Sequence, residues 1–211
     1  MKKKNLAGLA TGLFLFGIVG LANATPFSYT ATDTPLAIPL IGTSGNMSST
    51  ITVSENAFIS DLNVFIDLTH TYMGDLDIFL EHNGTQVQLF NQDGYNGDNL
   101  TGVLFDDEAN IAIDSWSPPF GPGTFQTDSS PDSGESRLLS DFNGMNLSGD
   151  WQLLIVDNYR GDAGQLNTFR IEGNAHSVQN NANSVPEPAT ATILFFGLAG
   201  LAGSGFRRKK K

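Results

Sequence analysis

The sequence predicts an all-β protein, an antiparallel β-sandwich of the jelly-roll type. Between residues 25 and 174, apolar side chains recur at every second position through most of the chain, which is the period of a half-buried strand. Clusters of Gly, Asn and Asp separate these segments, and no apolar stripe with helical spacing reaches a useful length. These 150 residues are enough for one domain with its own core.

Seven segments carry the alternating pattern and are expected to be strands. They are 50–53, 62–68, 76–80, 86–89, 102–105, 151–156 and 168–171. In the third segment Leu76, Ile78 and Leu80 define a buried face. We therefore expect Asp77 and Glu81, together with Asp75 just before the strand, on the opposite, solvated face.

The connection "THTYMG" (69–74) joins the second and third segments and is predicted to be a hairpin loop. Gly74 could take a positive φ there. His70 is expected to be a loop histidine that bonds backbone groups, and His82 an exposed residue before the Asn83-Gly84 turn. The histidines form no H-E-x-x-H motif, so a zinc peptidase site is not expected.

The N-terminal residues 1–24 are predicted to be a signal peptide. Three lysines precede an apolar run over 6–21, and Ala22 and Ala24 form the small-x-small pattern that signal peptidase cleaves. The protein is therefore expected to be exported, with Thr25 as its first mature residue.

The C-terminal region has three parts after a polar linker at 175–184. Val185, Pro186, Glu187 and Pro188 precede an apolar span (189–206) and a basic tail (207–211). This layout resembles the PEP-CTERM sorting signal. The resemblance implies recognition by an exosortase, a transient inner-membrane anchor, and delivery to the outer surface or extracellular matrix of a Gram-negative bacterium. The alternative is a plain membrane anchor behind a Pro-rich linker.

The charge is distributed very unevenly. Eight of the 11 Lys and Arg lie in the two terminal clusters, so three arginines face 22 acidic residues in the body, for a net charge of −19. Such a surface repels phosphate backbones, which argues against nucleic acid as a partner. It suits a solvated exported protein or one that binds divalent cations. The chain has no cysteine, which excludes disulfides and thiolate metal sites.

Several segments together resemble one known family. "DLTHTYMGDLDIFLEHNGTQVQLF", "GDNLTGVLFDDEA" and "LSDFNGMNLSGDWQLLIVDNYRGDAGQLNTFRIEG" are similar to the P domain that follows the catalytic domain of kexin-like and furin-like proprotein convertases. The resemblance runs from about residue 57 to 173, with an enlarged loop at 126–137. Only about 30 residues separate it from the predicted signal peptide, too few for a peptidase domain. No G-x-S-x-G motif occurs, so the protein is not expected to be an enzyme.

Calcium is the expected cofactor, because hard cations take oxygen ligands from loops and the resemblance is to a domain found beside calcium-dependent peptidases. The candidate ligands are Asp67, Asp75, Asp106, Asp107, Asp157 and Asp162. All lie at predicted strand ends or in loops. The alternative is that they are solvated turn residues.

Two functions of different classes fit these features. One is a non-catalytic surface module that binds a protein or glycan partner. The other is an accessory domain that docks in trans on a secreted serine peptidase and stabilises it. Loop aromatics could stack on sugars, or could instead plug the ends of the sandwich. They are Tyr72, Tyr95, Trp116, Phe120 and Tyr159.

Overall fold

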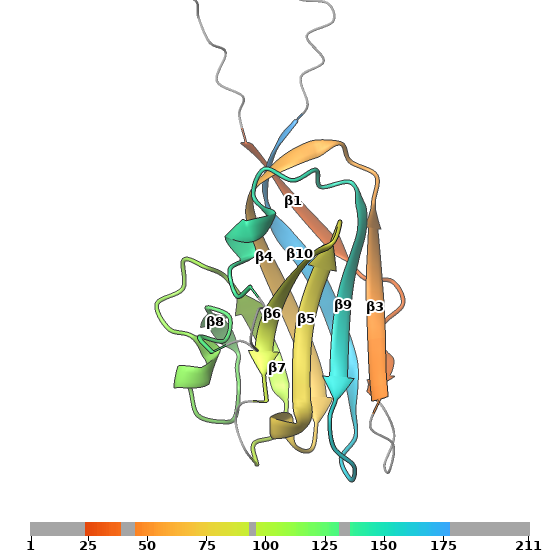
Figure 1. The fold of residues 1–211 in the computed structure, drawn as a ribbon, viewed down its shortest axis with the longest axis vertical. Helices are drawn as coiled ribbons and strands as arrows, with labels where there is room; N and C mark the ends of the chain where they lie inside the picture. The colour runs from red at the N-terminus through yellow and green to blue at the C-terminus, as the bar shows by residue number, and fades with distance from the viewer. Residues whose placement is uncertain (1–23, 39–44, 93–95, 131–135, 178–211) are drawn as a thin grey trace, which may run out of the picture. The chain divides into compact units, whose positions relative to one another are not determined.

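The computed structural model describes residues 24–38, 45–92, 96–130 and 136–177, and they form two β-sheets that pack face to face (Figure 1). The predicted all-β class is therefore confirmed. The jelly-roll connectivity stays a prediction. No helix in the described ranges has the length and apolar character needed to cross a bilayer. The predicted apolar span at 189–206 lies outside those ranges.

The first sheet is built around the two longest strands, β4 (Ala57–His70) and β10 (Gly164–Ser177). Its order is β1-β10-β4-β7-β8, and β2 also pairs with β10. The other members are β1 (Ala24–Thr30), β2 (Leu36–Ile38), β7 (Leu100–Phe105) and β8 (Gly123–Phe125). Neighbours are antiparallel except β7 and β8, which are parallel.

The second sheet has the order β3-β9-β5-β6 and is antiparallel throughout. Its strands are β3 (Gly45–Val53), β5 (Leu76–His82), β6 (Thr85–Asn91) and β9 (Gly149–Asp157). Three short 3₁₀ turns complete the described elements: η1 (Met73–Asp75), η2 (Ile113–Ser115) and η3 (Leu139–Phe142). All seven predicted strand segments fall within observed strands.

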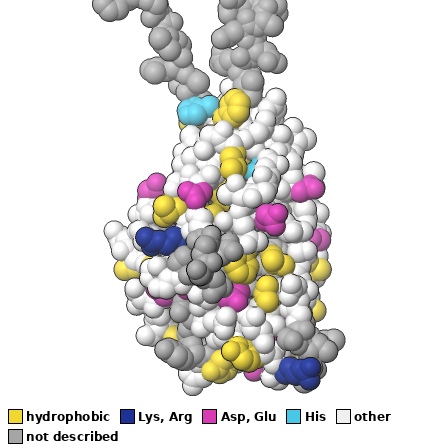
Figure 2. Space-filling model, viewed as in Figure 1, with side chains coloured by type: hydrophobic (Ala, Val, Ile, Leu, Met, Phe, Trp, Pro, Cys, Tyr) yellow, Lys and Arg dark blue, Asp and Glu magenta, His cyan; other side chains and the backbone are white. Residues whose placement is uncertain are grey.

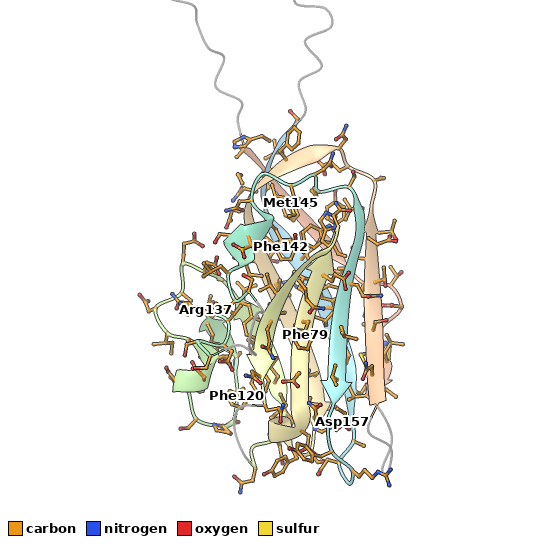
Figure 3. The ribbon with its side chains drawn as sticks, viewed as in Figure 1. Phe79, Phe120, Arg137, Phe142, Met145 and Asp157 are labelled. Carbon is orange, nitrogen blue, oxygen red and sulfur yellow. The ribbon has the colours of Figure 1, made fainter. Side chains whose placement is uncertain are left out.

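The core lies between the two sheets, as the alternation predicted. From the first sheet Val64, Ile66 and Leu68 are fully buried, and from the second Ile78 and Leu80 are equally buried. Each such side chain contributes about 1.5–3 kcal/mol relative to an exposed one. Larger side chains, among them Phe142 near one end (Figure 3), fill the remaining space.

The segment 69–74 is not a hairpin, so that prediction was wrong. β4 pairs with β10 and β7, whereas β5 pairs with β9 and β6, so the segment carries the chain from one sheet to the other. The turn is made by η1, and Gly74 lies inside it without a positive φ. Alternation shows that two strands are half-buried but cannot show whether they share a sheet.

Asp75 and Asp77 are both buried, at 5% and 6% exposure, which corrects the expectation of a solvated face. β5 is an inner strand of its sheet, and the polar side chains of Gln88, Gln92 and Asn158 cover its outer face at Asp77. The face is polar as predicted, but neighbouring residues shield much of it from water.

His82 is also buried, at 1% exposure, rather than exposed as predicted. Its ring stacks on Trp151 with centroids 3.9 Å apart and planes 2° apart. Nδ1 lies 2.9 Å from the Asp150 carbonyl oxygen, and Nε2 lies 2.7 Å from that of Asn146. β9, which lies beside β5, and the residues just before it supply this environment, which the local sequence around His82 does not reveal.

The pairing of β4 with β10 defines the two ends of the sandwich. His70 lies opposite Gly164 at one end, and Ala57 lies opposite Ser177 at the other. We call the first the His70 pole and the second the Ser177 end; the His70 pole is at the bottom of Figure 1. Ala24, beside the predicted signal cleavage position, pairs with His176 at the Ser177 end.

We predict that His82→Ala destabilises the protein by about 2–4 kcal/mol, because it removes a buried stack and the hydrogen bonding of the ring nitrogens. The melting temperature should fall by roughly 5–15 °C. His176→Ala, at a half-buried position on β10, is the matched control and should change stability by less than about 1 kcal/mol. Equal melting temperatures for the two variants would show that the buried stack contributes nothing specific.

Candidate binding site

Strands of both sheets end or begin at the His70 pole. β4 ends there at His70, η1 leads into β5, β9 ends at Asp157, and β10 begins at Gly164. Figure 3 labels Asp157 at this end of the view. Loops of a sandwich gather at such poles, so side chains that are distant in sequence meet here.

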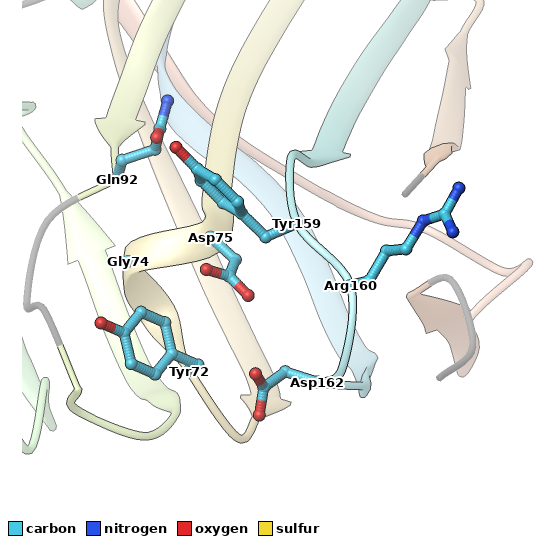
Figure 4. A pocket seen from close by; sticks show the side chains of 7 residues that line it. All are labelled: Tyr72, Gly74, Asp75, Gln92, Tyr159, Arg160 and Asp162. Atoms are coloured by element: carbon cyan, nitrogen blue, oxygen red, sulfur yellow. The ribbon is translucent and has the colours of Figure 1, made fainter. Parts of the chain in front are cut away.

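An open depression of about 390 Å³ lies at this pole (Figure 4). It is lined by Tyr72, Gly74, Asp75, Gln92, Tyr159, Arg160 and Asp162. In Figure 4 the Asp75 carboxylate lies between the Tyr72 and Tyr159 side chains and points toward Asp162, whereas the Arg160 side chain points away from them. Tyr159 is 57% exposed, so its ring is accessible to a ligand.

His70 is buried beneath the depression. Nδ1 lies 2.8 Å from the Tyr72 carbonyl oxygen and 3.3 Å from the Tyr72 amide nitrogen, which confirms the predicted bond to a backbone group, although His70 ends a strand rather than lying in a loop. Nε2 faces the buried Asp157 carboxylate, with 3.8 Å between Nε2 and Oδ2. The Tyr159 amide donates to the other carboxylate oxygen of Asp157 at 3.2 Å.

The Asp75 side chain has a different environment. Its backbone is held by two bonds, from its own amide to Tyr72 and from the Asn158 amide to its carbonyl oxygen. No residue in the described part of the chain donates a hydrogen bond to its carboxylate or pairs with it as an ion. Burial raises the pKa of Asp75, and the nearby Asp157 and Asp162 carboxylates raise it further, while His70 opposes the shift.

Burial raises the pKa of Asp157 as well, and Asp162 adds to this shift. The Tyr159 amide and His70 act in the opposite direction by favouring the charged carboxylate. Asp162 is half-buried and accepts a hydrogen bond from the Thr71 hydroxyl at 2.7 Å. The pole therefore concentrates negative charge that its own residues only partly compensate.

The structure brings together three of the six predicted calcium ligands, namely Asp75, Asp157 and Asp162. The other three bond to neighbouring groups elsewhere. Asp67 accepts from Gly102 and Asn167, Asp106 from Glu108, and Asp107 from Leu139 and Ser140. Within the described ranges, no three Asp, Glu or His side chains are grouped so that they could hold a metal ion. Calcium binding stays a prediction.

Some of the residues that line this depression were predicted from the sequence. Asp75, Asp162, Tyr72 and Tyr159 were candidates from the residue types alone, but Gln92 and Arg160 were not. Of the other predicted loop aromatics, Phe120 is buried and fills the sandwich, whereas Trp116 is 48% exposed. Tyr95 lies outside the described residues.

Basic side chains are sparse on the surface. The face in Figure 2 carries scattered acidic groups and few Lys or Arg among the coloured atoms. In the described ranges, Arg170 forms an ion pair with Glu172, and His70 Nε2 lies 3.8 Å from the Asp157 carboxylate. The negative charge at the pole is therefore not neutralised by a described lysine or arginine.

The chain matches the proprotein convertase P-domain family over residues 59–172, more than half of its length, and belongs to this family. The P domain is an accessory, non-catalytic domain. Residues 184–210 match the PEP-CTERM protein-sorting motif, which indicates export, processing by an exosortase and sorting to the bacterial cell surface. The predicted sorting residues Val185, Pro186, Glu187 and Pro188 fall in this match and, like Ala22, lie outside the described part of the structure.

Two solved structures are similar to the chain. One is a serine protease of Aeromonas sobria, with a TM-score of 0.44 and 18% identity. The other is a complex of that serine protease with a chaperone, with a TM-score of 0.39 and 14% identity. Each match covers 74% of this chain but only 28% of the protease chain. No curated protein matches the chain.

We predict that Asp75→Asn stabilises the protein at pH 7 by roughly 1 kcal/mol, or about 2–4 °C in melting temperature, because it removes a buried charge that has no described donor. Because the pKa of Asp75 is raised in the folded state, the folded protein binds more protons than the unfolded chain when the pH is above the ordinary pKa of 3.8. Wild-type stability attributable to Asp75 therefore falls as the pH rises through this window. The advantage of the variant should shrink toward zero as the pH falls to 3.8.

Asp77→Asn is the matched control, two residues away and equally buried. Asp77 accepts bonds from Asn158 at 2.6 Å and Gln92 at 3.1 Å, so its loss should cost about 1–3 kcal/mol at pH 7. Thermal unfolding of both variants between pH 4 and 8 measures the difference. A destabilising Asp75→Asn, or one whose effect does not vary with pH, would contradict this description of the pole.

Proposed function

We propose that the protein is a non-catalytic P-domain module at the outer surface or in the extracellular matrix of a Gram-negative bacterium, where it binds a protein or glycan partner. The family match supports an accessory rather than a catalytic role, and the sorting motif supports surface delivery. On this proposal signal peptidase and an exosortase process the two ends, with a transient inner-membrane anchor between these steps.

The observation that carries the binding role is the position of the depression relative to the C-terminal connection. β10 runs from Gly164 at the His70 pole to Ser177 at the opposite end, and the sorting motif follows later in the sequence. Fourteen strand residues span about 46 Å. A module held through the chain beyond Ser177 therefore has its open depression at the distant end of the sandwich, where a partner can reach it.

The second candidate is docking in trans on a secreted serine peptidase. Exposed apolar side chains beside β8 favour it, since Trp116 and Ile111 are 48% and 38% exposed. Both residues contact β8 or the residue after it. The Gln126 amide donates a hydrogen bond to the Ile111 carbonyl oxygen, and the Trp116 ring makes an edge contact with the Phe125 ring. Apolar surface of this kind commonly marks a contact with another protein.

Single cysteine variants distinguish these possibilities, because the natural chain contains no cysteine. Arg160→Cys reports on the His70 pole, where Arg160 lines the depression and is exposed, Trp116→Cys on the β8 side, and Phe58→Cys, 46% exposed on β4, on the Ser177 end. Each full-length variant is expressed in the native bacterium, and intact cells are treated with a membrane-impermeant maleimide. We expect all three to be labelled, with Arg160→Cys labelled most slowly because a partner covers the pole.

Labelling that requires cell lysis would contradict surface exposure. Slowest labelling at Trp116→Cys would favour peptidase docking over binding at the pole. Equal rates at the three sites, matching those of the purified protein, would show that no partner covers either surface under these conditions and would contradict both proposals.

A further inference from the structure

We infer that the depression at the His70 pole binds a basic side chain, the ammonium of a lysine or the guanidinium of an arginine, presented by a partner protein. This inference rests on the proposed surface-binding function and names the chemistry of its partner. It goes beyond that function because it assigns a recognition group to specific residues.

The first argument is the missing partner of Asp75. Asp75 as a residue is 5% exposed, it lines the depression, and no described residue bonds to its carboxylate. Burial of a carboxylate without a donor or a countercharge is costly. A cationic group entering the depression supplies both the hydrogen-bond donors and the opposite charge that Asp75 lacks.

The second argument is the composition of the walls. Tyr72 and Tyr159 flank the Asp75 carboxylate in Figure 4, and Asp162 lies on the side toward which it points. Tyrosine ring faces attract cations, and the aliphatic part of a lysine or arginine packs well against them. Two rings with two carboxylates form a receptor for an organic cation rather than for an anion or a purely apolar group.

The third argument concerns why the depression suits an organic cation better than a metal ion. Calcium requires six to eight oxygen ligands at about 2.3–2.6 Å. The acidic groups in the described ranges do not converge closely enough to form such a set, and the depression of about 390 Å³ is open and partly aromatic. Its size and walls suit a side chain rather than a single ion.

Arg160 is a cationic side chain of this protein that could compete with a partner's basic side chain for the depression. It lines the depression but extends away from Asp75 in Figure 4, and its side chain is exposed. Its positive charge nonetheless opposes the approach of another cation. Removing this charge by Arg160→Gln should therefore strengthen binding, which gives the test a variant with the opposite sign.

The test titrates the full-length protein with a short blocked peptide, acetyl-glycyl-arginyl-lysyl-glycine amide, by calorimetry at low and moderate salt. A peptide with citrulline and Nε-acetyl-lysine in place of the two basic residues is the neutral control. We expect saturable binding of the basic peptide, weakening as salt rises, and none of the neutral one. Asp75→Asn and Tyr159→Ala should each weaken binding by roughly tenfold.

Asp150→Asn is the matched charge control. It makes the same Asp-to-Asn change at the end of β9 that lies away from the His70 pole, so it should leave the affinity for the peptide unchanged. Binding that is indifferent to both Asp75→Asn and Tyr159→Ala would overturn the assignment. So would calcium binding that depends on Asp75 without any binding of the peptide, or equal binding of the two peptides. If Arg160→Cys is protected on cells while Asp75→Asn leaves that protection intact, this inference fails and the proposed surface function stands.

Discussion

The antiparallel pairing of β4 and β10 is the constraint on which the rest of the structure depends. These fourteen-residue strands lie at the centre of the first sheet and fix both ends of the sandwich. At one end they place His70 against Gly164, directly below the loops that form the depression. At the other they bring the chain out at Ser177, beside the start of β1. The separation of the His70 pole from Ser177 follows from this pairing.

The same topology explains why charge collects at the His70 pole. The chain crosses between sheets at 69–75 and turns again at 158–163, so Asp75 meets Asp157 and Asp162, which are distant from it in sequence. Asp77, two residues beyond Asp75, is enclosed by amide donors. Asp75 faces the open depression instead. Two buried carboxylates only two residues apart thus have different environments, one enclosed by amide donors and the other facing the depression.

The sequence predicted the strands and most of the core, because alternation records which side chains face inward. It could not predict that β4 and β5 lie in different sheets, since alternation looks the same in a hairpin and in a crossover between sheets. For the same reason His82 and Asp77 were expected to be exposed, although Trp151 and Asn158 cover them from distant parts of the chain. The candidate site was partly visible through Asp75 and Tyr159, but its assembly depends on tertiary contacts.

The most direct test of this description is the titration of the Asp75 carboxyl group followed by carbon NMR, in the free protein and with the basic peptide bound. Burial and the neighbouring carboxylates should place the pKa of free Asp75 above its ordinary value of 3.8, and a bound cation should lower it. A pKa at or below 3.8 in the free protein would show that Asp75 is already compensated. That result would contradict the central claim that this pole holds a buried negative charge for a cationic partner.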